Sequence, residues 1–155
     1  MKLFKLLFLS ILVAATMSCS DDDDPIEDTA SLKISDLSGS WIATSSVHTS
    51  NSDASKKYDM ISNGGEIRYT MFSDGRVRTW IDFGTFQDEY DALATLNGNL
   101  LTITPAESTR KVDKAIVVKN GNTITMTNSN SEFDFSLTGA TPVSSTAVTV
   151  FVPNK

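Results

Sequence analysis

The chain has 155 residues and a formal net charge of −6; 40% of its residues are hydrophobic and 21% are charged. Six of its 19 acidic residues lie in the segment 21–28, so the rest of the chain is nearly balanced in charge. A balanced surface excludes the basic patch with which proteins bind nucleic acids. The length after this segment suits one domain with its own hydrophobic core.

The first 18 residues have the pattern of a secretory signal peptide. Lys2 and Lys5 form a basic start, residues 6–15 are almost all apolar, and a small residue precedes Cys19. A transmembrane helix needs about 20 apolar residues, which is about twice the length of this stretch. We therefore expect residues 1–18 to be a signal peptide that is removed after export.

Cys19 is the only cysteine of the chain, so it has no intramolecular partner for a disulfide. The segment 15–19, Ala-Thr-Met-Ser-Cys, resembles the lipobox of bacterial lipoproteins, with Thr16 where such boxes usually carry Leu. This resemblance implies that Cys19 becomes the new N-terminus and carries fatty acyl chains such as palmitate. Two acyl chains hold a protein stably on a membrane. The alternative is a free, buried cysteine, with the signal cleaved elsewhere.

An acidic segment follows the cysteine. Four consecutive aspartates at 21–24 precede Pro25, and a like-charge block of this kind stays extended and disordered. We expect residues 19–33 to form a lipidated acidic tether. The block also resembles the signal that sends some Gram-negative lipoproteins to the outer face of the outer membrane. That resemblance implies a lipid-anchored protein of the cell outer membrane that faces the cell exterior; the alternative is a solvated linker without a targeting role.

Residues 34–155 have the pattern of an all-β domain. Short runs rich in Val, Ile, Thr and aromatic residues alternate with period two, and no long stretch has helical spacing. The expected strands are 41–48, 66–72, 76–83, 87–96, 99–104, 114–119, 122–127 and 132–137, with a ninth at 147–152 that closes or covers an edge.

Turn residues indicate how these strands are connected. The pairs Asp74-Gly75, Asn97-Gly98 and Asn120-Gly121 predict type I′ hairpin turns between antiparallel neighbours. Barrel closure removes the exposed edges of such a sheet. We therefore expect an antiparallel up-and-down eight-stranded β-barrel with an extra C-terminal strand, and a β-sandwich is the alternative.

Alternation within the strands also indicates which side chains face the interior. Ile81 and Phe83, for example, share one face of their strand, opposite Arg78 and Asp82. The interior of an eight-stranded barrel is either filled by side chains or holds one small ligand. The candidate residues for lining a ligand site are Tyr69, Met71, Ile81, Phe83, Ile103, Val118, Met126 and Phe135.

Several short motifs resemble those of lipocalins. The segment 37–41, Leu-Ser-Gly-Ser-Trp, resembles the G-x-W signature of the first lipocalin strand. The segments 72–77 and 90–100 are similar to the lipocalin-like domains of many bacterial lipoproteins. The resemblance implies a lipocalin-like barrel over residues 34–155 in which Gly39 and Trp41 plug the closed end. It also implies that the loop joining the first two strands overhangs the mouth.

The chain offers few groups for catalysis. His48 is its only histidine, and without a second histidine or an available cysteine it does not predict a zinc site. We expect His48 to be an ordinary surface residue. Asp88, Glu89 and Asp91 are clustered carboxylates, but adjacent residues of a strand face opposite ways, so Asp88 and Glu89 do not form a facing catalytic pair. The sequence therefore predicts no enzyme, no cofactor and no metal site.

Two features suit binding. The segment 49–62 is longer than a hairpin requires, and long loops in compact domains are often functional; the alternative is a disordered surface excursion. Trp80 is expected to point outward. There it is either a contact for a glycan or a protein, or it packs under the ninth strand or on an arginine side chain.

The leading hypothesis is a lipid-anchored, surface-exposed, lipocalin-like lipoprotein that binds a small apolar or amphipathic ligand without catalysis. The competing hypothesis is a non-catalytic structural or interaction module with a filled barrel, whose outer surface contacts a glycan or a protein partner. In both, the membrane is a partner through Cys19. A lined cavity of about 300 Å³ or more favours the ligand site, and a solid interior favours the module.

Overall fold

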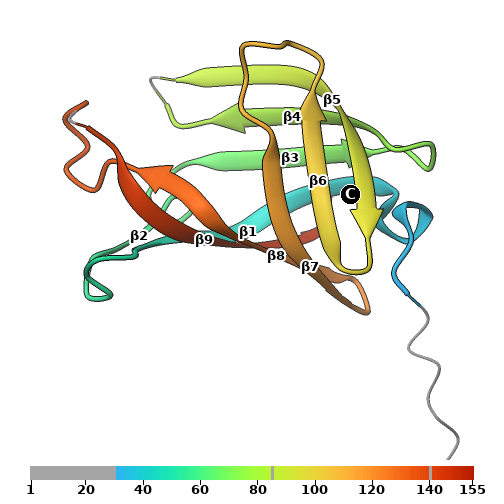
Figure 1. Cartoon of the computed structure of the whole chain (residues 1–155), viewed down its shortest axis with the longest axis horizontal. Coiled ribbons are helices and arrows are strands. Elements are labelled where there is room, and N and C mark those ends of the chain that lie inside the picture. Colours follow the sequence, from blue (N-terminus) through green and yellow to red (C-terminus); the bar gives the residue numbers. More distant parts are fainter. Residues whose placement is uncertain (1–30, 85, 140) are drawn as a thin grey trace, which may run out of the picture. The chain divides into compact units, whose positions relative to one another are not determined.

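The computed structural model describes residues 31–84, 86–139 and 141–155. The predicted signal peptide, the lipidation site Cys19 and the tether up to residue 30 lie outside the described residues. The described chain is built from β-strands and one short 3-10 helix, η1 (Ile34–Leu37) (Figure 1). None of the helical structure in this part of the chain is long and apolar enough to cross a bilayer.

Eight strands form a closed antiparallel barrel, as predicted. The ring runs in the order β1-β3-β4-β5-β6-β7-β8-β9 and closes because β9 pairs with β1 as well as with β8. The strands are β1 (Gly39–Ser50), β2 (Lys57–Asp59), β3 (Glu66–Met71), β4 (Arg76–Asp82), β5 (Gln87–Asn97), β6 (Leu100–Pro105), β7 (Asp113–Asn120), β8 (Thr123–Phe133) and β9 (Val143–Pro153).

One strand, β2, lies outside the ring. It pairs with the second half of β1, at Val47 to Thr49, whereas the first half of β1 pairs with β3. We expected the extra strand at the C-terminus, but β9 is a full member of the ring. The reason is that the segments 122–127 and 132–137 do not form two strands. Their residues up to Phe133 belong to the single strand β8, which continues through a register shift between Asn128 and Ser131.

Two tight hairpins use their glycines differently from the prediction. In the β5–β6 turn, Asn97 pairs with Leu100, so the central residues are Gly98 and Asn99. Gly98 has a φ of +60°, and Gly121 has the same place in the β7–β8 turn with a φ of +56°. A positive φ at the first central position alone is typical of a type II′ turn. The predicted type I′ assignment is therefore wrong for these two hairpins.

The alternating strand directions give the barrel two different ends. The helix η1, the C-terminus and the hairpins β3–β4, β5–β6 and β7–β8 lie at one end, which we call the closed end (Figure 1). The longer connections that follow β1, β4, β6 and β8 lie at the opposite end, which we call the mouth. The described chain begins at the closed end.

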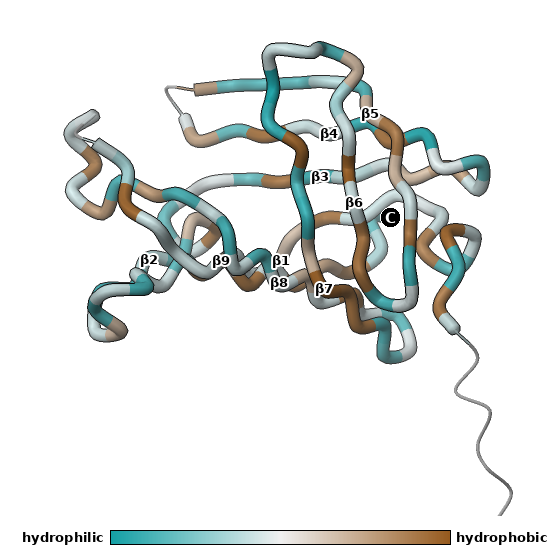
Figure 2. Tube along the Cα trace, viewed as in Figure 1, coloured by the Kyte–Doolittle hydropathy of each residue, from teal (hydrophilic) through white to brown (hydrophobic). Residues whose placement is uncertain are grey.

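Apolar side chains fill the closed end. Leu37 of η1 is fully buried, and Trp41, which follows Gly39 at the start of β1, is 7% exposed. Met71 and Val77 are buried beside the β3–β4 hairpin. Along the strands, apolar and polar residues alternate, as the colours in Figure 2 show. The barrel is therefore packed solid at one end, and any open space lies toward the mouth.

Candidate functional site

A cavity of about 240 Å³ lies inside the barrel, between the filled closed end and the mouth. Its wall is formed by side chains from seven strands, by Met60, which follows β2, and by Phe83, which follows β4. The lining is mostly apolar and includes Ile67, Leu101, Ala115, Ala147 and Phe151, with polar groups from Ser46, His48, Asp113, Asn128 and Thr149. An apolar cavity with a few polar groups is the usual composition of a small-molecule site.

Most of the predicted lining residues face this cavity. Tyr69, Ile81, Phe83, Ile103 and Met126 all contribute to its wall. Met71 also faces inward, but it is 2% exposed and belongs to the packed core of the closed end rather than to the cavity. Polar and apolar residues alternate in β3, and apolar residues on one face of β4 and of β6 place Ile81 and Ile103 inward.

The structure corrects two predicted lining residues. Val118 is 57% exposed and points outward, because Ala115 and Val117 occupy the inner face of β7. Phe135 lies beyond the end of β8, outside the barrel interior, where its ring meets the edge of the Phe133 ring at a centroid distance of 5.0 Å. The strand predicted at 114–119 is therefore present with its inner face wrongly assigned, whereas the strand predicted at 132–137 does not form, because β8 ends at Phe133.

A second cavity, of about 410 Å³, lies at the mouth and shares Met60 and Phe83 with the first. Its wall includes Tyr58 of β2 and Phe133 at the end of β8, whose rings stack at 5.2 Å. The loop predicted over 49–62 therefore contributes to the mouth through β2 and the residues that follow it. Gly65 allows the Phe83 ring to pack directly on the backbone of this wall, since a Cβ there would come within 2.7 Å of that ring.

His48 is not the surface residue that we expected. It is 8% exposed, lines the inner cavity and stacks on Phe133 at a centroid distance of 4.5 Å. Its Nδ1 lies 3.5 Å from Ser145 Oγ and 3.4 Å from Ser131 Oγ, which is long for hydrogen bonds that would activate a nucleophile. Burial lowers the pKa of His48, so the imidazole is neutral at neutral pH.

Asp113 is the one carboxylate among the described residues that line the inner cavity. It is the first residue of β7 and lies opposite Ile103 of β6. Burial raises the pKa of its carboxyl group. Asp113 was not among the predicted site residues, although alternation with Ala115 and Val117 would have placed it on the inner face.

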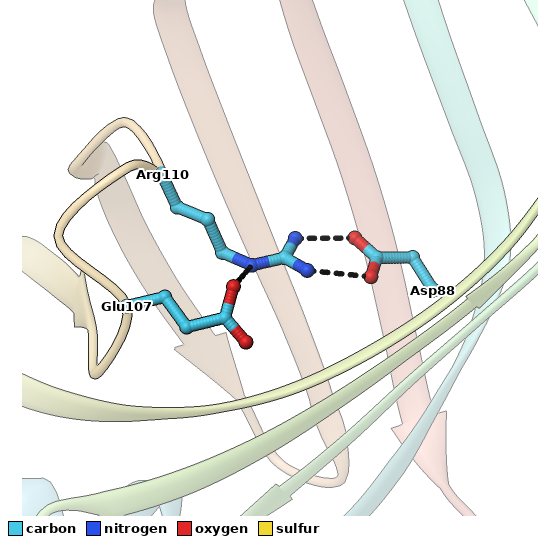
Figure 3. Close-up of polar contacts among 3 residues, drawn as sticks. All are labelled: Asp88, Glu107 and Arg110. Carbon is cyan, nitrogen blue, oxygen red and sulfur yellow. Dashed lines mark hydrogen bonds and ion pairs between the residues drawn. The ribbon is translucent and has the colours of Figure 1, made fainter.

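A cluster around Arg110 ties the β6–β7 connection to the barrel. Its guanidinium donates to both oxygens of Asp88, at 2.5 and 2.8 Å, and its Nε donates to Glu107 at 3.0 Å, as Figure 3 shows. The same guanidinium lies 4.6 Å from the centroid of the Tyr90 ring. These contacts hold the β6–β7 connection over β5 and neutralise the charge of Arg110.

The predicted acidic cluster is divided between the two faces of β5. Asp88 pairs with Arg110, whereas Glu89 and Asp91 are exposed and both pair with Arg78, at 3.6 and 3.0 Å. The expectation that Asp88 and Glu89 do not form a facing pair agrees with this arrangement.

Trp80 packs against an arginine on the outer surface. The Arg68 guanidinium lies 4.6 Å from the centroid of its ring, and the ring is half-buried. Of the two interpretations of Trp80, packing on an arginine side chain is therefore the one that the geometry supports.

The described residues contain no group of three or more His, Cys, Asp or Glu side chains placed to hold a metal ion. Comparison of the chain with protein-family models, with curated proteins and with solved structures finds no significant match in any of the three.

Proposed function

We propose that the protein is a lipocalin-like, lipid-anchored lipoprotein of the cell surface that binds a small apolar or amphipathic ligand in its barrel, without catalysis. The observation that carries this proposal is the inner cavity, which is lined by apolar side chains from most strands of the ring and also has several polar groups in its wall. Packed barrels fill such space with side chains, whereas here a cavity remains beside the core.

The size of the cavity sets the size of the ligand. About 240 Å³ is smaller than the roughly 300–1,000 Å³ of sites for drug-sized molecules. The mouth cavity of about 410 Å³ adjoins it through Met60 and Phe83. A short hydrocarbon chain in the inner cavity with a larger group at the mouth fits this pair of spaces, which supports an amphipathic ligand.

The position of the tether supports display of the mouth. The described chain begins at Ser31, next to η1 at the closed end. A tether from Cys19 would therefore join the barrel at the end opposite its mouth.

A matched pair of substitutions on β7 tests ligand binding. Ala115 lines the cavity and Val118 points outward, so Ala115→Phe fills the site and Val118→Phe adds the same ring to the surface. Each variant, together with Cys19→Ser to prevent acylation, is purified from the natural host and weighed by native mass spectrometry. We expect a bound small molecule in the parent and in Val118→Phe, and its loss from Ala115→Phe. Circular dichroism establishes that both variants are folded.

The anchor is tested separately. We expect metabolic labelling with palmitate to mark the full chain and not its Cys19→Ser variant, and we expect protease treatment of intact cells to digest the barrel domain. An unlabelled chain would exclude the anchor, and a protected domain would exclude surface display.

One observation favours the competing interaction module. The outer face of β5 to β7 carries exposed apolar side chains, with Leu93 at 58%, Val118 at 57% and Ile116 at 42% exposed. Exposed apolar patches often mark contacts with other proteins. Two results together would support the interaction module over the ligand-binding protein. No bound molecule would be found in any variant, and Val118→Phe would be the only variant that disrupts a complex seen by native mass spectrometry.

A further inference from the structure

The carboxylate of Asp113 has no partner in the part of the chain that the structure describes. It faces the inner cavity, and neither a hydrogen bond nor an ion pair joins it to another described residue. Asp113 is half-buried, and even partial burial of a carboxylate without a partner costs stability. A charged group kept in an apolar cavity despite this cost indicates that its positively charged partner belongs to a bound ligand and not to the chain.

The cationic side chains near Asp113 are engaged elsewhere. Arg110 binds Asp88 and Glu107, and Lys111 forms an ion pair of 2.7 Å with Glu132. Lys114, the next residue of β7, is exposed on the outer face. His48 shares the cavity, but burial lowers its pKa and leaves it neutral. The positive charge that would compensate Asp113 is thus absent from the described lining.

One tyrosine, Tyr69, lines the same cavity as Asp113. Burial raises the pKa of the Tyr69 phenol, and the charge of Asp113 raises it further. Aromatic rings beside a carboxylate bind ammonium groups well, because the ring face attracts a cation. The rest of the wall, with Ile81 and Ile103, suits a hydrocarbon chain.

We propose that the ligand is an amphipathic amine, whose protonated amino group forms an ion pair with Asp113 while its hydrocarbon part fills the inner cavity. This inference rests on the proposed ligand-binding function and specifies its ligand class. Bound ammonium favours the ionised carboxylate, so the ion pair forms at neutral pH despite the burial of Asp113.

Three eight-carbon probes that differ only in the head group test the inference: n-octylamine, octan-1-ol and octanoate. Calorimetric titration uses residues 19–155 with Cys19→Ser. We expect n-octylamine to bind at least tenfold more tightly than octan-1-ol, and octanoate to bind most weakly. Asp113→Asn should reduce the affinity for the amine to that for the alcohol and leave the alcohol unchanged. The control Glu89→Gln removes an exposed carboxylate of the outer face and should alter none of the three affinities.

Thermal unfolding gives a second measurement, whose result would be different if Asp113 had only a structural role. Asp113→Asn removes an uncompensated buried charge, so it should raise the Tm of the free protein while it weakens amine binding. n-Octylamine should raise the Tm of the parent more than that of the variant.

The outcomes separate the two proposals. If octan-1-ol binds as tightly as the amine, or if Asp113→Asn leaves amine affinity unchanged, the amine inference is wrong and the ligand-binding function stands. If none of the three probes binds, the cavity does not accept a hydrocarbon chain and both proposals fall. Should Asp113→Asn fail to fold, the ranking of the three probes on the parent decides.

Discussion

The indole nitrogen of Trp41 donates a hydrogen bond of 2.8 Å to the carbonyl oxygen of Leu37. The bond links the first strand to η1, and both side chains are buried at the closed end. Because Leu37 is the last residue of η1, its carbonyl has no helical partner further along the chain. The tryptophan therefore fixes the helix across the closed end of the barrel.

Trp41→Phe should destabilise the barrel by about 1–3 kcal/mol, since it removes the donor and leaves a buried carbonyl unpaired. Urea unfolding measures the loss. The control is Trp80→Phe, because Trp80 is half-buried on the outer surface and makes no such bond with the described residues. Equal losses in the two variants would contradict the role assigned to Trp41.

Position 75 requires a glycine, both because of its backbone conformation and because of the atoms around it. Its φ is +90°, and a Cβ at this position would lie 2.8 Å from the carbonyl oxygen of Ala94 on β5. Gly121 also has a positive φ, but a Cβ there would meet nothing within 4 Å. We expect Gly121→Ala to cost about 1–2 kcal/mol from backbone strain alone, and Gly75→Ala to cost clearly more. A smaller loss for Gly75→Ala in denaturant unfolding would show that β5 moves aside.

Arg110 should hold the β6–β7 connection in place. Arg110→Gln removes both bonds to Asp88, so we expect a lower Tm and faster hydrogen exchange over residues 106–112. The guanidinium lowers the pKa of Asp88, so the stabilisation is present above the ordinary aspartate pKa, near 3.8, and is lost as the pH falls below it.

The control for Arg110 is the exposed pair of Arg76 with Asp74. Its side chains are 66% and 54% exposed, so Arg76→Gln should leave the Tm almost unchanged. In a double-mutant cycle, Arg110→Gln and Asp88→Asn should be coupled. Additive effects would mean that the paired geometry does not stabilise the fold.

The β-barrel could be predicted because, in most strands, the sequence pattern shows which residues face inward. In β3, polar residues alternate with Ile67, Tyr69 and Met71, so only one face of the strand can be buried. The apolar run Ile116 to Val118 lacks this alternation, so the sequence does not specify which of its residues face inward, and Val118 was placed on the wrong side.

His48 was misplaced for a different reason. A β-bulge between Ala43 and Ser45 shifts the register of β1 against β9. Before the bulge Trp41 and Ala43 face inward, and after it Ser46 and His48 do. A bulge reverses the alternation and has no distinct sequence signal here. The Arg110–Asp88 pair joins residues 22 positions apart, and such a contact follows only from the assembled sheet.

His48 should make the barrel less stable in mild acid. Burial lowers its pKa in the folded state below the ordinary value near 6.5, so the unfolded chain binds the proton more readily. The free energy of unfolding should therefore fall as the pH drops below about 6.5. Because His48 is the only histidine, its ring protons in a nuclear magnetic resonance titration report this pKa without overlap.

The variant His48→Gln isolates this effect from the carboxylates. Burial raises the pKa of Asp113, so this residue alone makes the fold more stable as the pH falls from neutral toward its pKa, opposite in sign to His48. Asp113 is present in both proteins, so the difference between their urea-unfolding curves at pH 8 and pH 5.5 contains the histidine contribution. We expect the parent to lose more stability than His48→Gln over this interval. Equal losses, or a measured His48 pKa at or above about 6.5, would mean that water reaches the imidazole through the mouth and that the inner cavity is wet.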